Sequence, residues 1–183
     1  MPENLIVRSS APTLAGLKTA SLFNIPLSDK DHIRKNVSAF NKKYHERGIE
    51  MVIMKYMGNR VLLYVFRPSR LKKDFSNQKT RNILIEHGYN PDNYGACIAV
   101  LIQKMNSSSE FPHEIGCFLG YPPEDVKGFM EDKDGSLYTG FWKVYADVDT
   151  ALRTFAKYRK CIRVYMDCYS RGISLDRLVV SQV

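Results

Sequence analysis

The chain has 183 residues, is 44% hydrophobic and carries a formal net charge of +8 at pH 7. This length and composition suffice for a hydrophobic core, so neither disulfides nor a structural metal is needed for stability. No apolar run approaches the roughly 18 residues that span a bilayer, and the N-terminus lacks the pattern of a signal peptide. We therefore expect one cytoplasmic domain, residues 1–183, without a membrane partner.

The N-terminal part of the chain predicts a loop, a strand and a helix. Residues 10–18 combine small residues with a proline and a glycine and are expected to be irregular. A short strand is expected at Ala20–Asn24. Ser28–Asp31 then has the pattern of a capping box, and the apolar residues after it recur at helical spacing until Gly48.

Two apolar runs, Met51–Tyr56 and Val61–Phe66, flank a turn that contains a glycine. Runs of this kind predict a β-hairpin over residues 51–66. The second run has no polar face, which indicates a strand that is covered by helices on both sides.

The rest of the chain alternates helices with short strands. A helical region opens at Pro68, and a second helix with a continuous apolar stripe follows it. Ile115–Tyr121 and Phe141–Ala146 predict two strands separated by a short helix, and Asp147 caps a long final helix. Together these elements predict an α+β (mixed α/β) domain with a central sheet of about four or five strands, including the hairpin at 51–66, covered by helices.

The positive charge is concentrated in one stretch of the sequence. Residues 60–81 hold seven basic residues against one acidic residue, Asp74: Arg60, Arg67, Arg70, Lys72, Lys73, Lys79 and Arg81. Clusters of Lys and Arg bind phosphate backbones, but they also keep a surface solvated. Nucleic acid is therefore an alternative partner, which we favour less than a solvated surface.

His113 and Glu114 are candidates for general acid–base catalysis. They begin the sequence HEIGC (His113–Cys117), which resembles the HExxH motif of zinc proteases with a cysteine in the last position. That motif requires a helix, whereas the expected strand would place positions 113 and 117 about 13 Å apart, so we expect no metal site. A histidine titrates near neutral pH, and the alternative role of His113 is to fix a turn by hydrogen bonding.

Further candidates for ligand binding come from rings and cations. Tyr121 ends one expected strand, and Trp142 and Lys143 are neighbours on the next, where the rings either stack on a ligand or belong to the core. Lys18 offers a point charge to a carboxylate or phosphate. Arg159 lies on the apolar arc of the last helix, about 20° from Val148 on a helical wheel, and needs a partner or room to extend into solvent.

No other motif defines a reaction. The four cysteines form no CxxC pair and are expected to be free, mostly buried thiols. No GxxxxGK[ST], GxGxxG or GxSxG pattern is present, which argues against P-loop hydrolysis, Rossmann dinucleotide binding and α/β-hydrolase chemistry. The sequence therefore assigns no cofactor.

Long motifs connect the chain with a known family. They are APTLAGLKTASLF (Ala11–Phe23), FPHEIGCFLGYPPEDVKGF (Phe111–Phe129), FWKVY (Phe141–Tyr145) and YRKC (Tyr158–Cys161). Over nearly its whole length the chain resembles an uncharacterised bacterial family of unknown function that is common in anaerobic Firmicutes. The resemblance implies a small cytoplasmic bacterial protein, and it implies no catalytic residues.

The leading hypothesis is a small-molecule site, with or without catalysis, formed by segments 10–18, 111–121 and 142–145. Its catalytic candidates are His113 and Glu114. Its candidates for ligand binding are Lys18, Tyr121, Trp142, Lys143 and Arg159. The alternatives are a noncatalytic module that binds nucleic acid or another acidic partner through residues 60–81, and a protein that acts through oligomeric interaction.

Overall fold

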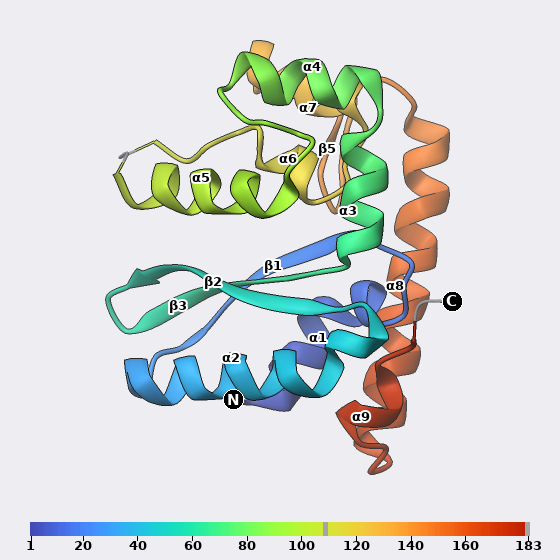
Figure 1. Cartoon of the computed structure of the whole chain (residues 1–183). Helices are drawn as coiled ribbons and strands as arrows, with labels where there is room; N and C mark the ends of the chain where they lie inside the picture. The colour runs from blue at the N-terminus through green and yellow to red at the C-terminus, as the bar shows by residue number, and fades with distance from the viewer. Residues whose placement is uncertain (108–109, 182–183) are drawn as a thin grey trace. The chain divides into compact units, whose positions relative to one another are not determined.

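The computed structural model describes residues 1–107 and 110–181. Contacts divide the chain into two compact units: unit 1 comprises residues 1–69 and 158–183, and unit 2 comprises residues 70–157. Within the described residues the fold is α+β, with nine α-helices, a three-stranded antiparallel sheet and a two-stranded hairpin (Figure 1). The expected single central sheet is wrong, because the five strands belong to two separate sheets.

The sheet of unit 1 consists of β1 (Ala20–Pro26), β2 (Glu50–Met57) and β3 (Arg60–Phe66). All neighbours are antiparallel, and β3 lies in the middle of the order β1-β3-β2. The predicted hairpin is confirmed, since β2 and β3 pair directly on either side of a two-residue turn, Gly58–Asn59. All six residues of Val61–Phe66 are buried. Because successive side chains of a strand point to opposite faces, both faces of β3 are buried, which explains why its sequence has no polar face.

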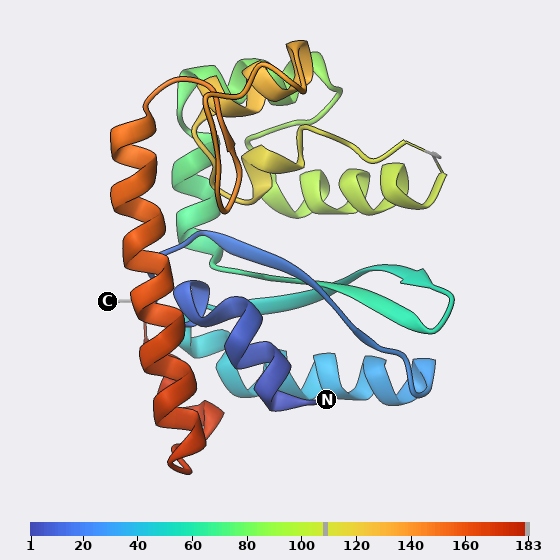
Figure 2. The same ribbon diagram turned by 180° about the vertical axis from the view of Figure 1, so that it is seen from behind.

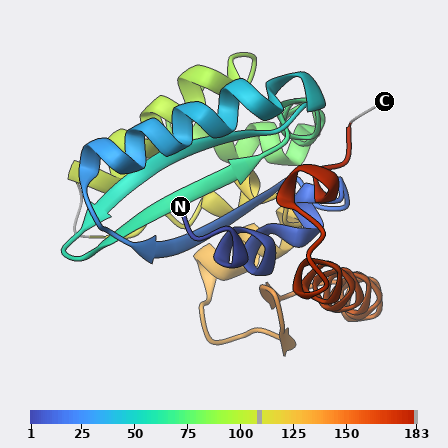
Figure 3. The same ribbon diagram turned by 90° about the horizontal axis from the view of Figure 1, so that it is seen from below.

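Two helices cover one face of this sheet (Figure 1, Figure 3). Helix α2 (Lys30–Tyr44) begins as predicted, although its N-cap is Asp29, whose carboxylate accepts a hydrogen bond of 2.7 Å from the His32 N–H. A short 3-10 turn, η1 (His45–Arg47), follows α2 and ends at Gly48, where the sequence predicted the end of the helix.

Helix α1 (Glu3–Leu14) is a correction to the sequence-based expectation of an irregular segment at 10–18. The small residues at the end of α1 are buried, and the Ser10 hydroxyl donates to the Ile6 carbonyl at 2.5 Å. Pro12 lies in the last turn of α1, where it cannot donate the helical hydrogen bond to the residue four positions earlier, yet it did not prevent the helix. The small side chains at the end of α1 allow close packing, whereas in the sequence alone they indicate a loop.

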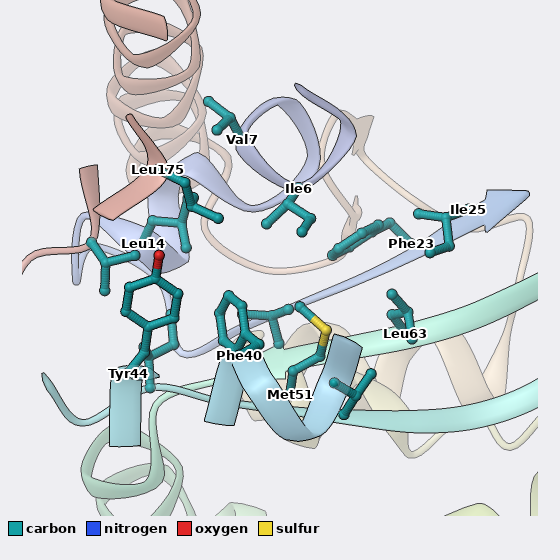
Figure 4. Close-up of a cluster of buried hydrophobic side chains, with 14 of the residues drawn as sticks. Ile6, Val7, Leu14, Phe23, Ile25, Phe40, Tyr44, Met51, Leu63 and Leu175 are labelled. Carbon is teal, nitrogen blue, oxygen red and sulfur yellow. The ribbon is translucent and has the colours of Figure 1, made fainter. Parts of the chain in front are cut away.

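The core of unit 1 lies between the sheet and these helices. Side chains from α1, α2 and all three strands point toward one another in it, among them Ile6, Phe40 and Leu63 (Figure 4). The C-terminal helix α9 (Leu175–Leu178) adds Leu175 and Leu178 to the same cluster. Apolar burial on this scale is the main favourable contribution to folding.

Arg67, directly after β3, is the largest side chain buried in the described chain, with 1% of its surface exposed. Its guanidinium donates to the carbonyls of Thr13 at 2.6 Å and Leu14 at 2.5 Å, and thereby satisfies the C-terminus of α1. It also donates to the carbonyls of Val180 at 2.8 Å and Arg47 at 3.2 Å. One cation therefore joins three distant segments of unit 1 to the end of its central strand.

Unit 2 is mainly helical (Figure 2). Its elements are the end of α3 (Pro68–Phe75), α4 (Gln78–Glu86), α5 (Tyr94–Ser107), α6 (Ile115–Phe118), α7 (Pro123–Glu131), the hairpin β4 (Tyr138–Thr139) and β5 (Lys143–Val144), and the start of α8 (Val148–Ser170). The predicted strand at Ile115–Tyr121 is wrong, because this segment forms α6 and a turn. The predicted strand at Phe141–Ala146 is confirmed only for its two central residues.

The error at α6 has a physical cause. Phe118 packs edge-to-face against Phe75 and Tyr89, with ring centroids 5.1 and 5.3 Å apart. A run of apolar residues this short fits a buried strand and a buried single helical turn equally well, and tertiary packing decided between them. None of the helices in the described residues is both long enough and apolar enough to cross a membrane.

We predict that Arg67→Met lowers the free energy of unfolding by at least about 3 kcal/mol, because it leaves buried carbonyls without their donor. Urea unfolding followed by circular dichroism measures this loss. The control is Arg60→Met at the exposed start of β3, which should change stability by no more than about 0.5 kcal/mol. Equal stability of the two variants would contradict the role given to Arg67.

Candidate functional site

Unit 2 contains an apolar pocket with a volume of about 320 Å³. Helices α6 and α7, the segment before α6 and the β4–β5 hairpin form its walls. Its aromatic lining residues are Phe111, Tyr121, Phe129 and Trp142. The polar side chains that reach it are His113, Asp125 and Lys143. An apolar cavity with a few polar groups is the usual form of a small-molecule site.

Trp142 and Tyr121 form one wall of the pocket. Their rings stack with centroids 4.9 Å apart and an interplanar angle of 27°. The edge of the Trp142 ring also packs on Phe155 of α8, at 4.4 Å between centroids. Gly140 allows this arrangement, since a Cβ atom there would lie 2.2 Å from the Phe155 ring. The tryptophan is therefore held between a partner on each side.

Asp125 fixes the tryptophan and the chain that follows it. Its buried carboxylate accepts a hydrogen bond of 2.7 Å from the Trp142 indole N–H. Its other oxygen accepts from the backbone N–H groups of Tyr145 at 2.7 Å and Ala146 at 3.1 Å. The site residues expected from the sequence do not include Asp125. No local signal identifies it, because its donors lie 17 to 21 residues further along the chain.

Helices α6 and α7 are in close contact beneath the pocket. A Cβ atom on Gly116 would lie 2.7 Å from the Val126 side chain, so only glycine permits this approach. The backbone closes the turn after α6 through a hydrogen bond of 3.0 Å from the Tyr121 N–H to the Gly116 carbonyl. The tyrosine ring is thereby directed into the wall next to the tryptophan.

His113 lies in the turn before α6 and reaches the pocket. Its ring packs edge-to-face on Phe129, with centroids 5.1 Å apart and an interplanar angle of 85°. Neither ring nitrogen is hydrogen-bonded to any residue that the structure describes. Within the described residues, no side-chain hydrogen bond supports the alternative role, in which His113 fixes the turn. Backbone bonds hold the turn instead, such as the 3.2 Å bond from the Ile115 N–H to the Pro112 carbonyl.

Glu114 does not line the pocket with its neighbour. Its buried carboxylate accepts hydrogen bonds from Lys104 at 2.8 Å and from the Tyr89 hydroxyl at 2.9 Å. Burial by itself raises the pKa of Glu114, but hydrogen bonds from Lys104, the backbone and Tyr89 outweigh this effect and lower the pKa. Glu114 therefore anchors the turn that carries His113, and it does not line the pocket beside the imidazole.

The cysteine in the HEIGC sequence is also directed into the core. Cys117 is 1% exposed, and burial raises its pKa to about 12, so it remains a protonated thiol. The argument from strand spacing was wrong, because residues 113–117 form a turn and a helix. Among the described residues there is no group of three or more His, Cys, Asp or Glu side chains placed to hold a metal ion. All four cysteines are free, as predicted.

Lys143 lies at the edge of the pocket. Its ammonium donates a hydrogen bond to the Lys133 carbonyl and lies 3.8 Å from the carboxylate of Asp134, which is fully exposed. It also lies 5.8 Å from the centroid of the Phe129 ring. Lys143 and His113 therefore meet around the same phenylalanine.

Lys18 and Arg159 belong to unit 1, and neither lines the pocket. Lys18 is buried, its ammonium donates to the Ala20 carbonyl, and burial lowers its pKa to about 7. Arg159 is exposed, although the buried Phe155 lies only about 40° away on the helical wheel. The convergence of segment 10–18 with segments 111–121 and 142–145 stays a prediction.

The basic residues of 60–81 do not form one continuous set. Arg60 and Arg67 belong to unit 1, and the other five belong to unit 2. Arg67 is buried, Arg81 makes a bidentate ion pair with Asp92, and Lys79 pairs with Glu124 at 2.7 Å. Three of the seven are therefore already engaged within the protein.

Comparison with known proteins places the chain in a family. Residues 6–179 match DUF3793, a family of proteins of unknown function. The chain belongs to DUF3793. The predicted membership in a family of unknown function is thereby confirmed, while the bacterial origin stays a prediction. Neither the curated proteins nor the solved structures yield a match to the chain. The function of this DUF3793 protein must therefore be argued from its own residues.

Asp125→Ala should release the hairpin from α7 and expose the indole of Trp142, because three N–H groups lose their acceptor. We expect a loss of about 2–4 kcal/mol in unfolding free energy and a red shift of tryptophan fluorescence. Trp142 is the only tryptophan in the sequence, so this signal reports on the site alone. Glu131→Gln, an exposed change on the same helix, should leave the emission unchanged. An unshifted spectrum in Asp125→Ala would show that the hairpin is held by other contacts.

The ion pair of Glu114 predicts a pH dependence of stability. In the folded protein the pKa of Glu114 is below its ordinary value of 4.5. The contribution of Glu114 to the free energy of unfolding is therefore fully present above pH 4.5, and it is lost as the pH falls through the folded-state pKa. The stability advantage of the wild type over Glu114→Gln should therefore shrink as the pH falls below about 4.5. Urea titrations of both proteins at pH values above and below that point measure it. A constant difference would contradict the charged pair.

Proposed function

We propose that the DUF3793 protein binds a small molecule with a planar, apolar body in the pocket of unit 2. The observation that carries this proposal is His113. Its imidazole lies on the wall of an otherwise apolar, aromatic cavity and has no hydrogen bond to the described part of the chain. A polar group without a partner in such a wall gains most from a ligand that supplies one.

The volume and shape of the pocket support one ring system as ligand. About 320 Å³ is at the lower end of the range of small-molecule sites. Tyr121 and Trp142 already stack on each other, so the stacked pair supplies a fixed wall. Rigid walls lower the entropic cost of binding, because few side chains must become ordered around the ligand.

The geometry favours ligand binding over acid–base catalysis in which His113 and Glu114 act as a pair. A general base is usually oriented by a second group, and Glu114, the partner expected from the sequence, is occupied by Lys104 and Tyr89. His113 alone remains as a group that exchanges a proton with a bound molecule. Any reaction in this pocket would therefore depend on the imidazole and on the ligand itself.

Binding of nucleic acid or another acidic partner remains a separate hypothesis. The structure offers no observation in favour of this hypothesis, because three of the basic residues already bind groups within the protein: Arg67, Arg81 and Lys79. Retention on DNA that persists above roughly 50 mM salt would support nucleic-acid binding. Binding through phosphate contacts weakens as the salt concentration rises, but it is still measurable at roughly 50 mM.

The proposed function is tested with indole as a neutral planar probe. We expect resonances of the pocket residues to shift in two-dimensional NMR during a titration, with a Kd no weaker than about 1 mM. Phe129→Ala should weaken binding by about tenfold, because it removes one aromatic wall. Leu137→Ala, an exposed change in the same unit outside the pocket, should bind indole as the wild type does. No shift in the wild type, or equal affinity of the two variants, would overturn the proposal.

A further inference from the structure

The pocket has spare hydrogen-bond donors but few spare acceptors. Two of its polar side chains, His113 and Lys143, carry N–H groups, and the third, Asp125, carries the acceptor oxygens. The hydrogen bonds that each of these groups already makes decide which kind of ligand the pocket can satisfy.

The Asp125 carboxylate, the acceptor among these groups, already accepts hydrogen bonds from within the protein. One oxygen of Asp125 accepts from the Trp142 indole, and the other accepts from the backbone of Tyr145 and Ala146. A carboxylate offers about four lone-pair positions, and this one is 4% exposed. Its negative charge is therefore compensated by three N–H groups and has little capacity left for a cationic ligand.

The donor groups of Lys143 and His113 make fewer hydrogen bonds within the protein than the Asp125 carboxylate does. An ammonium group has three N–H bonds, and the Lys143 ammonium donates to the Lys133 carbonyl. Asp134 is 3.8 Å away and fully exposed, so this ion pair neutralises the lysine only weakly. The His113 imidazole has no hydrogen bond within the described residues.

The two donors lie near the same aromatic ring. Both contact Phe129, His113 through its ring and Lys143 through its ammonium. Asp125 lies four residues earlier on α7, about one helical turn away. The pocket therefore has a donor end around Phe129 and an aromatic body between Phe129 and Trp142.

We infer that the ligand is a planar apolar molecule with one terminal carboxylate, which Lys143 and His113 bind at the donor end. This inference rests on the proposed function and specifies its ligand class. A hydrogen bond to an ionised group is shorter and stronger than a neutral one, and an apolar surround strengthens it further.

An aromatic cage for a cation is the competing interpretation of such a pocket, since aromatic faces attract ammonium groups. The lysine argues against it. A second cation would have to lie beside the Lys143 ammonium, while the only carboxylate in the lining is already compensated. A ligand cation would therefore meet repulsion without gaining a free counter-ion.

The test uses three probes that share one phenyl ring and differ in charge: phenylacetate, phenylacetamide and phenethylammonium. Calorimetric titration of the whole chain at about 0.15 M salt limits the contribution of distant charges. We expect phenylacetate to bind at least about tenfold more tightly than phenylacetamide, and phenethylammonium to bind more weakly than both.

Three variants test which residue causes the preference for phenylacetate. Lys143→Met should abolish the preference for phenylacetate over phenylacetamide, because it removes the cation while it keeps the apolar stem. His113→Phe retains the ring contact with Phe129 but removes the N–H donor, and should reduce the preference in part. Lys127→Met, an exposed lysine on α7 outside the pocket, is the matched control and should keep the full preference.

Each outcome has a distinct meaning. Equal affinity for phenylacetate and phenylacetamide, or a preference that persists in Lys143→Met, overturns the carboxylate inference and leaves the proposed function standing. Tighter binding of phenethylammonium overturns it in favour of a cation site. If none of the three probes and no indole binds, the proposed function itself falls.

Discussion

The candidate site depends on one buried carboxylate, that of Asp125. A charge inside a protein is costly unless hydrogen bonds compensate it, and here three N–H groups do so. All three come from residues 142–146, the segment that contains β5. A two-stranded hairpin with two residues in each strand has little stability of its own. The position of Trp142 therefore follows from the need of Asp125 for donors.

The buried polar groups of the chain separate framework from site. Arg67 in unit 1 and Asp125 and Glu114 in unit 2 are each matched by several partners within their own unit. Groups of this kind fix a structure, because the loss of one partner leaves a buried charge or dipole unsatisfied. His113 and Lys143 are different. They are partly exposed at a cavity and retain donors that the protein does not use.

The proximity of His113 and Glu114 in sequence was misleading for function. The turn before α6 directs the imidazole to the pocket, while the carboxylate points to Lys104 and Tyr89 in the core of unit 2. The pair is thus divided between two tasks. One residue is available to a ligand, and the other holds the turn in place. Membership in DUF3793, a family of unknown function, leaves this division of roles as the main clue to what the site does.

The sequence by itself determined the elements that have a strong local signal. The hairpin at 51–66 and the helix after Asp29 followed from periodicity and capping, which act between near neighbours. It also indicated that His113, Tyr121, Trp142 and Lys143 were unusual, and these four side chains line one pocket. Aromatic and cationic residues outside an apolar stripe were a sufficient signal for them.

Only the tertiary structure decided the rest. Small residues at 10–14 and glycine at 116 were compatible with loop or strand, and only the packed structure shows that both positions are helical, while 15–18 is irregular as expected. Asp125 could not be recognised as the support of Trp142, because its three donors lie 17 to 21 residues further along the chain. Local propensity describes neighbours in sequence, whereas a buried charge selects its partners in space.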